Sequence, residues 1–401
     1  MIIGGGVEQI PAYEAAKKRG LSIVGTDVNA DAPALALADH ILLVSTRDAE
    51  ATANMAMEFN THHPIDGVMT IANDVPYTVA LTAKKLGLNS ISLDAAQCAS
   101  DKLLMKQKFQ MNKVACPWFS AVDNIDQLRR LTDNRDQEHY VLKPVDGRGA
   151  RGVLLIDDTI DLHWAFEESK NWGDSGRLIL EKFIPGVQLS TESFIIDDVC
   201  YTPGIAERNY SRMESFRPNI IEDGGTIPAC LTDLQRVAID DLILRGARAM
   251  GLTSGIVKGD LVIDSEGTPL IIELAARLSG GWFASHEIPA ATGVHLVDAV
   301  ISYALGEKVS PEQLKPKWDR SIAIRYWFPE PGKIKSIRGE EKLKEIPGML
   351  KYGFFRKPGD LQPTIRMHPD RFGYVLVQGV DREEAIARVE QALSSLQIET
   401  E

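Results

Sequence analysis

Two acidic residues stand at matching positions in an apolar hairpin. The chain runs from one β-prone segment, 256–263, through the turn formers of 264–269 into a second β-prone segment, 270–273. Asp260 and Glu273 are equidistant from the centre of this turn, so a simple register places them opposite one another on the same face. Like charges opposite each other on a sheet repel, and we therefore expect a cation between them. Two hard carboxylates favour Mg²⁺ held against phosphate oxygens, which predicts a nucleoside triphosphate site.

Composition and charge exclude several classes of partner. The chain has 401 residues, enough for two or three domains, with 44% hydrophobic and 25% charged residues. The net charge of −12 argues against a broad nucleic-acid or membrane surface. No apolar run approaches the roughly 18 residues of a membrane span, and no signal peptide is visible. The four scattered cysteines favour free thiols. We expect a cytoplasmic protein with no nucleic-acid or membrane partner.

Residues 1 to about 95 alternate between short β-prone runs and helical patterns, with strands expected near 21–27, 40–44 and 67–70. This alternation favours a doubly wound parallel α/β sheet. The run Gly4-Gly5-Gly6 suggests a dinucleotide fingerprint, but Gln9 stands where that motif needs its third glycine. We therefore expect a tight turn between a strand and a helix there.

The rest of the chain changes character twice. From about residue 101 to 136 the pattern is helical, and strands then dominate up to about residue 196. After Gly306 the chain shows short strands and Gly/Pro turns, with a final helix expected over 383–393. A second α+β region and a β-rich C-terminal region are thus expected after the first domain.

A glycine-rich loop at 146–152 is the second strong signal. Its three glycines allow backbone N–H groups to approach phosphate oxygens, and Lys143 stands at the end of the preceding strand. The alternative is a plain hairpin turn, with Arg148 and Arg151 merely solvated. The loop does not fit the Walker pattern, because no G-K-[ST] closes it.

Four motifs together carry a resemblance to a known family. In chain order they are Ser100-Asp101-Lys102, Lys143 before the glycine loop, Glu181-Lys182-Phe183-Ile184-Pro185-Gly186, and the hairpin with Asp260, Glu273 and Arg277. This order resembles the ATP-grasp ligases, in particular the carboxylate–amine ligase branch beside carbamoyl-phosphate synthetase, biotin carboxylase, purine-synthesis enzymes and L-amino acid ligases. The resemblance implies three domains: a preATP-grasp domain over 1–95, a two-lobed ATP-grasp domain over 96–305 with its small lobe at about 115–185, and a β-rich cap over 306–401.

The resemblance also assigns roles to individual residues. It implies phosphate contacts from Lys102 and Lys143 and from the closing loop with Arg148, Gly149 and Gly152. It implies adenine contacts from Glu181, Lys182, Phe183 and Ile184, metal binding by Asp260 and Glu273, and catalysis by Arg277 with Lys143. Two positions depart from the family pattern: Gln188 replaces a glutamate that often binds ribose, and Ala275 replaces a common asparagine.

Substrate contacts are expected from residues that flank these motifs. The candidates are Asp74, Arg208, Arg212, Ser279, Gly280, Trp282 and His286. For each charged candidate a structural alternative stays open: a helix cap at Asp74, solvated surface arginines, and a satisfied structural histidine. Bidentate binding of a carboxylate is the chemistry that an arginine would contribute.

The activity implied by the resemblance is an ATP- and Mg²⁺-dependent ligation, with Mn²⁺ as a substitute metal. A carboxylate is phosphorylated to an acyl phosphate, an amine attacks it, and ADP and phosphate leave. The partners are then a small-molecule carboxylate and amine, and the family tendency suggests a homodimer. Two alternatives remain: a bicarbonate-activating carboxyphosphate enzyme, and a non-catalytic ATP-binding module.

Overall fold

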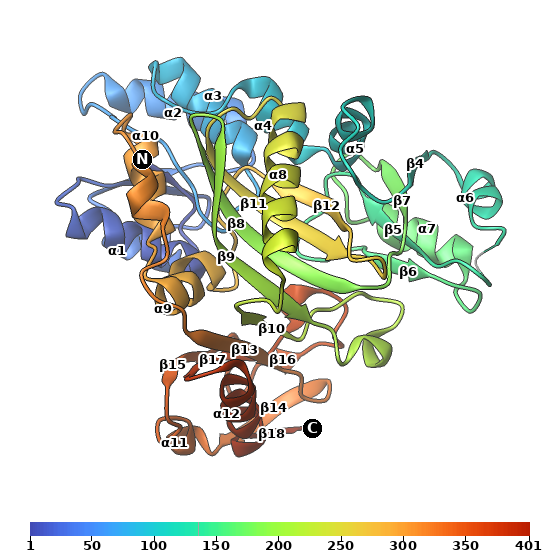
Figure 1. Cartoon of the computed structure of the whole chain (residues 1–401). Helices are drawn as coiled ribbons and strands as arrows, with labels where there is room; N and C mark the ends of the chain where they lie inside the picture. Colours follow the sequence, from blue (N-terminus) through green and yellow to red (C-terminus); the bar gives the residue numbers. More distant parts are fainter. Residues whose placement is uncertain (135) are drawn as a thin grey trace.

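An eight-stranded antiparallel sheet forms the centre of the molecule (Figure 1). The structure is a computed structural model that describes residues 1–134 and 136–401. In spatial order the strands are β12 (Pro269–Ala275), β11 (Gly255–Ile263), β8 (Val187–Ile196), β9 (Val199–Asn209), β10 (Gly224–Ile227), β13 (Ser321–Trp327), β17 (Gly373–Gly379) and β15 (Met349–Phe354). This sheet crosses the domain boundary expected near residue 305, and the three-domain division of the sequence stays a prediction.

The N-terminal part has the parallel sheet that its alternating pattern predicts. Its strands lie in the order β1 (Ile2–Ile3), β2 (Val24–Asp27) and β3 (His40–Leu43). The strand expected at 67–70 is reduced to a single parallel bridge between Ile2 and Met69. The accompanying helices are α1 (Ile10–Lys18), α2 (Ala49–Asn60), α3 (Pro76–Leu86) and α4 (Leu93–Ser100).

A small lobe follows, built on the four-stranded antiparallel sheet in the order β4 (Phe119–Val122), β7 (Leu178–Lys182), β5 (Tyr140–Pro144) and β6 (Leu154–Ile156). Its helices are α5 (Lys102–Met111), α6 (Ile125–Leu131) and α7 (Leu162–Lys170). The continuous helical pattern expected over 101–136 is wrong, because β4 interrupts it. Phe119 and Ala121 pack against the buried side chain of Ile179, so pairing with β7 overrides the local pattern.

The C-terminal region contributes three strands to the central sheet and has a small sheet of its own. That sheet has the order β16 (Leu361–Gln362), β14 (Gly332–Arg338) and β18 (Gln397–Thr400). The final helix, predicted over 383–393, is α12 (Arg382–Ser395). The remaining helices are α8 (Asp233–Ala249), which packs on β12 and β9, α9 (Ile288–Thr292), α10 (Leu296–Ala304) and α11 (Glu340–Leu343).

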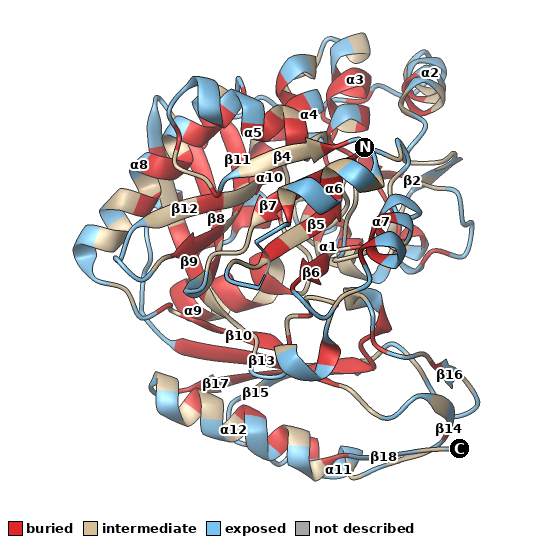
Figure 2. Cartoon of the chain, turned by 90° about the vertical axis from the view of Figure 1, so that its right-hand side faces the viewer, coloured by how far each residue is buried: buried red, intermediate tan, exposed pale blue. Residues whose placement is uncertain are grey.

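The largest core cluster joins the parts of the molecule to one another. It contains Tyr13 from α1, Phe194 from β8 and Leu376 from β17, all at most 1% exposed. Figure 2 shows the same arrangement as buried central strands with helices exposed on their outer faces. No helix in the described part of the chain is both long and apolar enough to cross a membrane. Burial of apolar side chains therefore holds the N-terminal part and the C-terminal strands against one sheet.

We expect Phe194→Ala to lower the free energy of unfolding by about 3–5 kcal/mol, because it removes a buried ring and leaves a cavity. The ring also makes an edge contact with Tyr303, at 5.9 Å between centroids. The control is Leu234→Ala on α8, where the residue is 84% exposed and the expected change is within about 0.5 kcal/mol. Chemical denaturation followed by fluorescence measures both variants. Equal unfolding midpoints would contradict the core role of Phe194.

Candidate functional site

A cavity of about 1410 Å³ lies where the N-terminal part, the small lobe, the central sheet and the C-terminal region meet. Most of the residues predicted to form the site line it. They are Asp74, Lys102, Lys143, Arg148, Gly149, Glu181, Lys182, Phe183, Ile184, Gln188, Arg208, Asp260, Glu273, Arg277, Ser279, Gly280 and Trp282. The fold thus brings residues from all four parts of the chain to one place.

Three predicted residues do not line this cavity. The Arg212 guanidinium lies over the rings of Phe216 and Phe328, at 5.4 and 5.1 Å. His286 packs edge-on against Trp282, its Nδ1 lies 2.9 Å from the Ser285 hydroxyl, and burial lowers the pKa of His286 to about 4. Gly152 ends the glycine loop, where its carbonyl accepts a hydrogen bond of 2.8 Å from the Ser169 hydroxyl. Substrate contacts from Arg212 and His286 therefore stay predictions, and neither residue lines the cavity.

Asp260 and Glu273 pair as predicted, but their pairing depends on a β-bulge that the sequence does not reveal. Asp260 lies opposite Glu273, whereas the next pair towards the turn is Leu261 with Ile271. Ile272 is therefore an extra residue, and the resulting β-bulge shifts the register by one. A simple symmetric register would pair the residues nearer the turn differently. The bulge is what turns Glu273 onto the face that carries Asp260.

Basic side chains hold both acids in the structure. Arg208 Nη1 lies 2.8 Å from Asp260 Oδ1, and Lys258 bonds the other oxygen of Asp260. Lys102 Nζ lies 3.3 Å from Glu273. Burial opposes the charge of Asp260, but Lys258 and Arg208 outweigh it and lower the pKa of Asp260 to about 2. Both acids are thus held by neighbouring cations, and Asp260 is kept ionised.

Helix capping and backbone hydrogen bonds hold Lys102 and the glycine loop in position. Asp101 caps α5 by accepting from Leu104 N at 2.8 Å, and this places Lys102 at the first helical position. Lys102 Nζ then donates to the Gly147 carbonyl at 2.7 Å. Gly149 has a φ of +61° and its carbonyl accepts from the backbone N of His368 at 3.2 Å. The C-terminal region therefore holds the glycine loop over the cavity.

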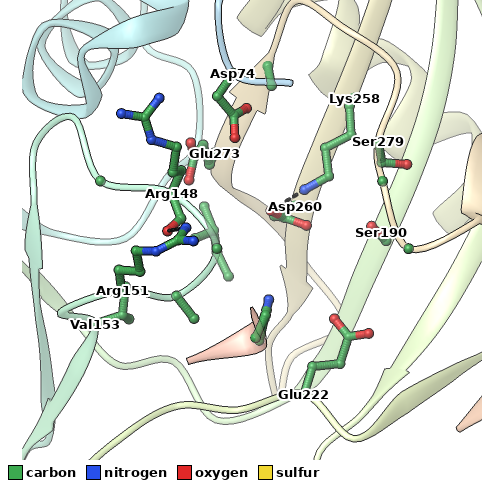
Figure 3. Close-up of a pocket in the computed structure, with 18 of the residues that line it drawn as sticks. Asp74, Arg148, Arg151, Val153, Ser190, Glu222, Lys258, Asp260, Glu273 and Ser279 are labelled. Carbon is green, nitrogen blue, oxygen red and sulfur yellow. Dashed lines mark hydrogen bonds and ion pairs between the residues drawn. The ribbon is translucent and has the colours of Figure 1, made fainter. Parts of the chain in front are cut away.

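The close-up of the cavity shows how the charged side chains face one another (Figure 3). Lys258 points towards Asp260, and Glu222 lies at the lower edge of the view. Arg148 and Arg151 project from the glycine loop on the opposite side. Arg148 pairs with the exposed Asp174 at 3.2 Å. The loop arginines are therefore available to move towards an anionic ligand.

Glu181 has a different environment from the one expected of an adenine ligand. Its carboxylate lies 2.9 Å from Lys143 Nζ and 3.3 Å from Lys106 Nζ, and all three side chains are buried. Burial opposes the charge of Glu181, but the two lysines outweigh it and lower its pKa. The sequence reasoning missed Lys106, although its position four residues after Lys102 places both lysines on one side of α5.

Arg277 is anchored by a residue from the N-terminal part. Its Nε and Nη2 lie 2.7 and 2.5 Å from Asp74 Oδ1. A parallel bridge between Ile71 and Leu278 brings the two segments together. Burial and Asp74 act oppositely on the guanidinium, and the net effect raises the pKa of Arg277. Asp74 is thus an ion-pair partner of Arg277 at the cavity wall and does not cap a helix.

Several lining residues were not found from the sequence. They are Glu8, Lys258, Glu222, Glu287, Tyr326, His368 and Arg371. Lys258 had a usable signal, because it stands two residues before Asp260 on the same strand face. The others come from loops and strands far apart in the chain, so no local spacing marks them.

The donor set can accept a divalent cation only with help from a ligand. No group of three or more His, Cys, Asp or Glu side chains with metal geometry occurs within residues 1–134 and 136–401. Asp260 and Glu273 supply two hard oxygen donors on one face. Mg²⁺ is commonly held by one or two carboxylates together with phosphate oxygens and water. The residues present fit that mode of binding.

Glu192 on β8 allows a pH test of the site. Its Oε1 accepts from Ser279 N at 2.7 Å, and burial raises the pKa of Glu192 from 4.5 to about 7. Between these values the folded protein binds more protons than the unfolded chain, so its stability falls as pH rises. Glu192→Gln keeps an oxygen acceptor but cannot ionise.

We therefore expect the unfolding temperature of Glu192→Gln, relative to the parent protein, to be higher at pH 8 than at pH 5. Thermal unfolding at the two pH values measures this difference. The other titrating groups are common to both proteins and cancel. A difference that does not change with pH would contradict the buried, uncompensated state of Glu192.

Comparison with known proteins identifies two domains in this chain. A model of the ATP-grasp domain matches residues 99–281, and a model of the L-amino acid ligase C-terminal domain 2 matches residues 325–401. Among curated relatives, an uncharacterized protein y4rH of Sinorhizobium fredii is 24% identical over 360 residues, which are 88% of this chain and 72% of the relative. Dapdiamide A synthase of Enterobacter agglomerans is 22% identical over 395 residues, which are 89% of this chain and 85% of that enzyme.

The fold matches solved structures over its whole length. The crystal structure of L-amino acid ligase from Bacillus licheniformis is similar with a TM-score of 0.84 and 23% identity, covering 100% of this chain and 98% of that one. At this level of identity the likeness concerns the fold. The two domain matches show that this chain contains an ATP-grasp domain and an L-amino acid ligase C-terminal domain.

Proposed function

We propose that this protein is an ATP- and Mg²⁺-dependent ligase that joins the carboxylate of one amino acid to the amine of another, releasing ADP and phosphate. The observation that carries the proposal is the placement of Asp260 and Glu273 on one face of the cavity, close to the anchored Arg277 and to Lys102. The ligases among its relatives support ATP-dependent carboxylate–amine ligation. The match to an L-amino acid ligase C-terminal domain supports amino acids as substrates.

The lysines and the glycine loop would bind the nucleotide. Lys102 and Lys143 offer cationic donors, and the loop offers Arg148 and backbone N–H groups with few side chains in the way. Lys143 can leave Glu181 at small electrostatic cost, because Lys106 remains beside that carboxylate. Closing of the loop would exclude water that could hydrolyse an acyl phosphate.

Arg277 would stabilise the charge that develops on the transferred phosphoryl group. Its guanidinium is positioned by two contacts with Asp74, so little reorganisation is needed when the charge forms. Asp260 and Glu273 would hold Mg²⁺, which would neutralise charge on the phosphate oxygens. These residues would position the reacting groups and stabilise their charge, which are the main contributions of a protein to phosphoryl transfer.

The proposed function is tested by incubating the protein with ATP, Mg²⁺ and pools of amino acids, and by measuring ADP and phosphate together with a new dipeptide mass. Release of AMP and pyrophosphate would contradict acyl phosphate chemistry. Bicarbonate-dependent ADP release without a dipeptide would favour the carboxyphosphate alternative. ATP binding with no turnover would favour a non-catalytic module.

Glu273→Gln is expected to lower kcat/KM at least about 100-fold, because it removes a charged oxygen donor for the metal while nearly preserving side-chain size. The matched control is Glu266→Gln, which changes an exposed acid in the turn of the same hairpin and should leave turnover unchanged. Coupled measurement of ADP release at saturating Mg²⁺ compares them. Activity of Glu273→Gln within a few-fold of the parent would remove Glu273 from the proposed metal site.

Lys143→Met should weaken ATP binding by roughly 10- to 100-fold, the loss expected for a hydrogen bond to a charged group. Glu181 keeps Lys106 as its counterion in this variant, so the fold should survive. Titration calorimetry with ATP and no amino acid measures binding apart from chemistry. Unchanged affinity, in a variant whose unfolding temperature matches the parent, would show that Lys143 does not contact the phosphates.

A further inference from the structure

The π-helical turn Phe283–Glu287 places a carboxyl group at the cavity wall. Trp282 starts the turn in a left-handed conformation with a φ of +68°, and its carbonyl accepts from Glu287 N at 3.1 Å. The turn lies close to β9 because that strand has Gly204, where a Cβ would fall 2.3 Å from Ile288 Cδ1. Glu287 is thereby brought against the sheet, at the edge of the cavity.

Glu287 has no counterion or hydrogen-bond partner in the described part of the chain. The residue is 2% exposed, and its Oε2 is buried without a partner. Arg325 is within electrostatic reach of Glu287, but its hydrogen bonds go to the Gly225 and Ile324 carbonyls and to Glu390. Burying a carboxyl group without a hydrogen-bond partner costs free energy. A ligand that donates a hydrogen bond to Glu287 would therefore be favoured at this position.

The surroundings of Glu287 favour a cationic ligand over an anionic one. Glu222 and Glu8 line the same part of the cavity as Tyr326, and Tyr326 lies within electrostatic reach of both acids and of Glu287. Glu222 is already neutralised by Arg208, whose Nε donates to it at 2.5 Å, and Glu8 accepts from Gly281 N at 2.7 Å. Glu287 alone among the three acids has no such partner in the described structure.

Two cations beside Trp282 and Tyr326 make their contacts with groups other than Glu287. Arg371 lies over the Tyr326 ring at 3.8 Å and donates to the Glu222 carbonyl at 2.6 Å. Lys351 lies over the ring of Trp282 at 4.6 Å. Burial, reinforced by Glu222, raises the pKa of Glu287 to about 8, as expected for a carboxyl without a compensating charge.

We propose that Glu287 is a specificity-determining residue that binds the cationic side chain of a basic amino acid substrate. The proposal rests on the proposed amino acid ligase function and deepens it, because it names the chemical class of one substrate. An ammonium or guanidinium group would donate to Glu287 beside the Trp282 and Tyr326 rings. A neutral side chain of similar length would leave the carboxyl unpaired, and selectivity follows from that difference.

The test compares lysine and ornithine with norleucine, in the intact protein and in Glu287→Gln. The parent should release ADP with higher kcat/KM for the basic amino acids. Glu287→Gln should lose about 10- to 100-fold of that kcat/KM and keep its activity with norleucine. The control is Glu390→Gln, which changes the exposed acid that pairs with Arg325 and does not line the cavity. This control should match the parent with every substrate.

Turnover with norleucine and the unfolding temperature show whether Glu287→Gln has folded. As a readout apart from catalysis, lysine should raise the unfolding temperature of the parent more than norleucine does, and this excess should vanish in Glu287→Gln. A parent that makes dipeptides without preferring basic amino acids would overturn the inference and leave the ligase function standing. An equal loss with basic and neutral amino acids in Glu287→Gln would overturn it too, because Glu287 would then serve a group common to all amino acids. Absence of ADP release with every amino acid would refute both proposals.

Discussion

The position of β11 between β8 and β12 is the constraint on which the site depends. β11 carries Lys258 and Asp260, and β12 carries Glu273 on the same face only because of the bulge at Ile272. If Ile272 paired regularly with Asp260 instead of bulging, Glu273 would pair with Gly259 and point to the opposite face, since a one-residue slip inverts the side chains of a strand. A single backbone irregularity therefore decides whether the two acids can share a cation.

Acidic and basic side chains pair with one another inside the cavity. Asp260 is held by Arg208 and Lys258, Glu273 by Lys102, and Asp74 by Arg277. Binding of a magnesium nucleotide would exchange partners: the cations would turn to phosphate and the acids to the metal. Such an exchange avoids exposing a buried charge at any stage, because each group passes from one partner to another.

The sequence allowed the ATP-grasp domain and most of the residues that line the cavity to be predicted, because those motifs are local. Lys143 stands just before its loop and Asp260 and Glu273 share one hairpin, so spacing alone carries the information. Glu287 and Tyr326 were not predicted, because they come together at the cavity only through tertiary packing. One local pattern was misleading, because the helical run expected over 101–136 contains β4. The pairing of Asp260 with Glu273 was predicted correctly, although the bulge that accompanies it was not.

The hydrogen bond from His368 N to the Gly149 carbonyl links the glycine loop, which belongs to the small lobe, to the C-terminal region. The loop belongs to the small lobe by sequence, yet its tip is held by the segment that also supplies Arg371. Movement of the loop must therefore either break this bond or carry the C-terminal segment with it. Under the proposed function, enclosure of the nucleotide and the shape of the substrate end would be mechanically linked, so a change in the last quarter of the chain would be transmitted to phosphates that it never touches.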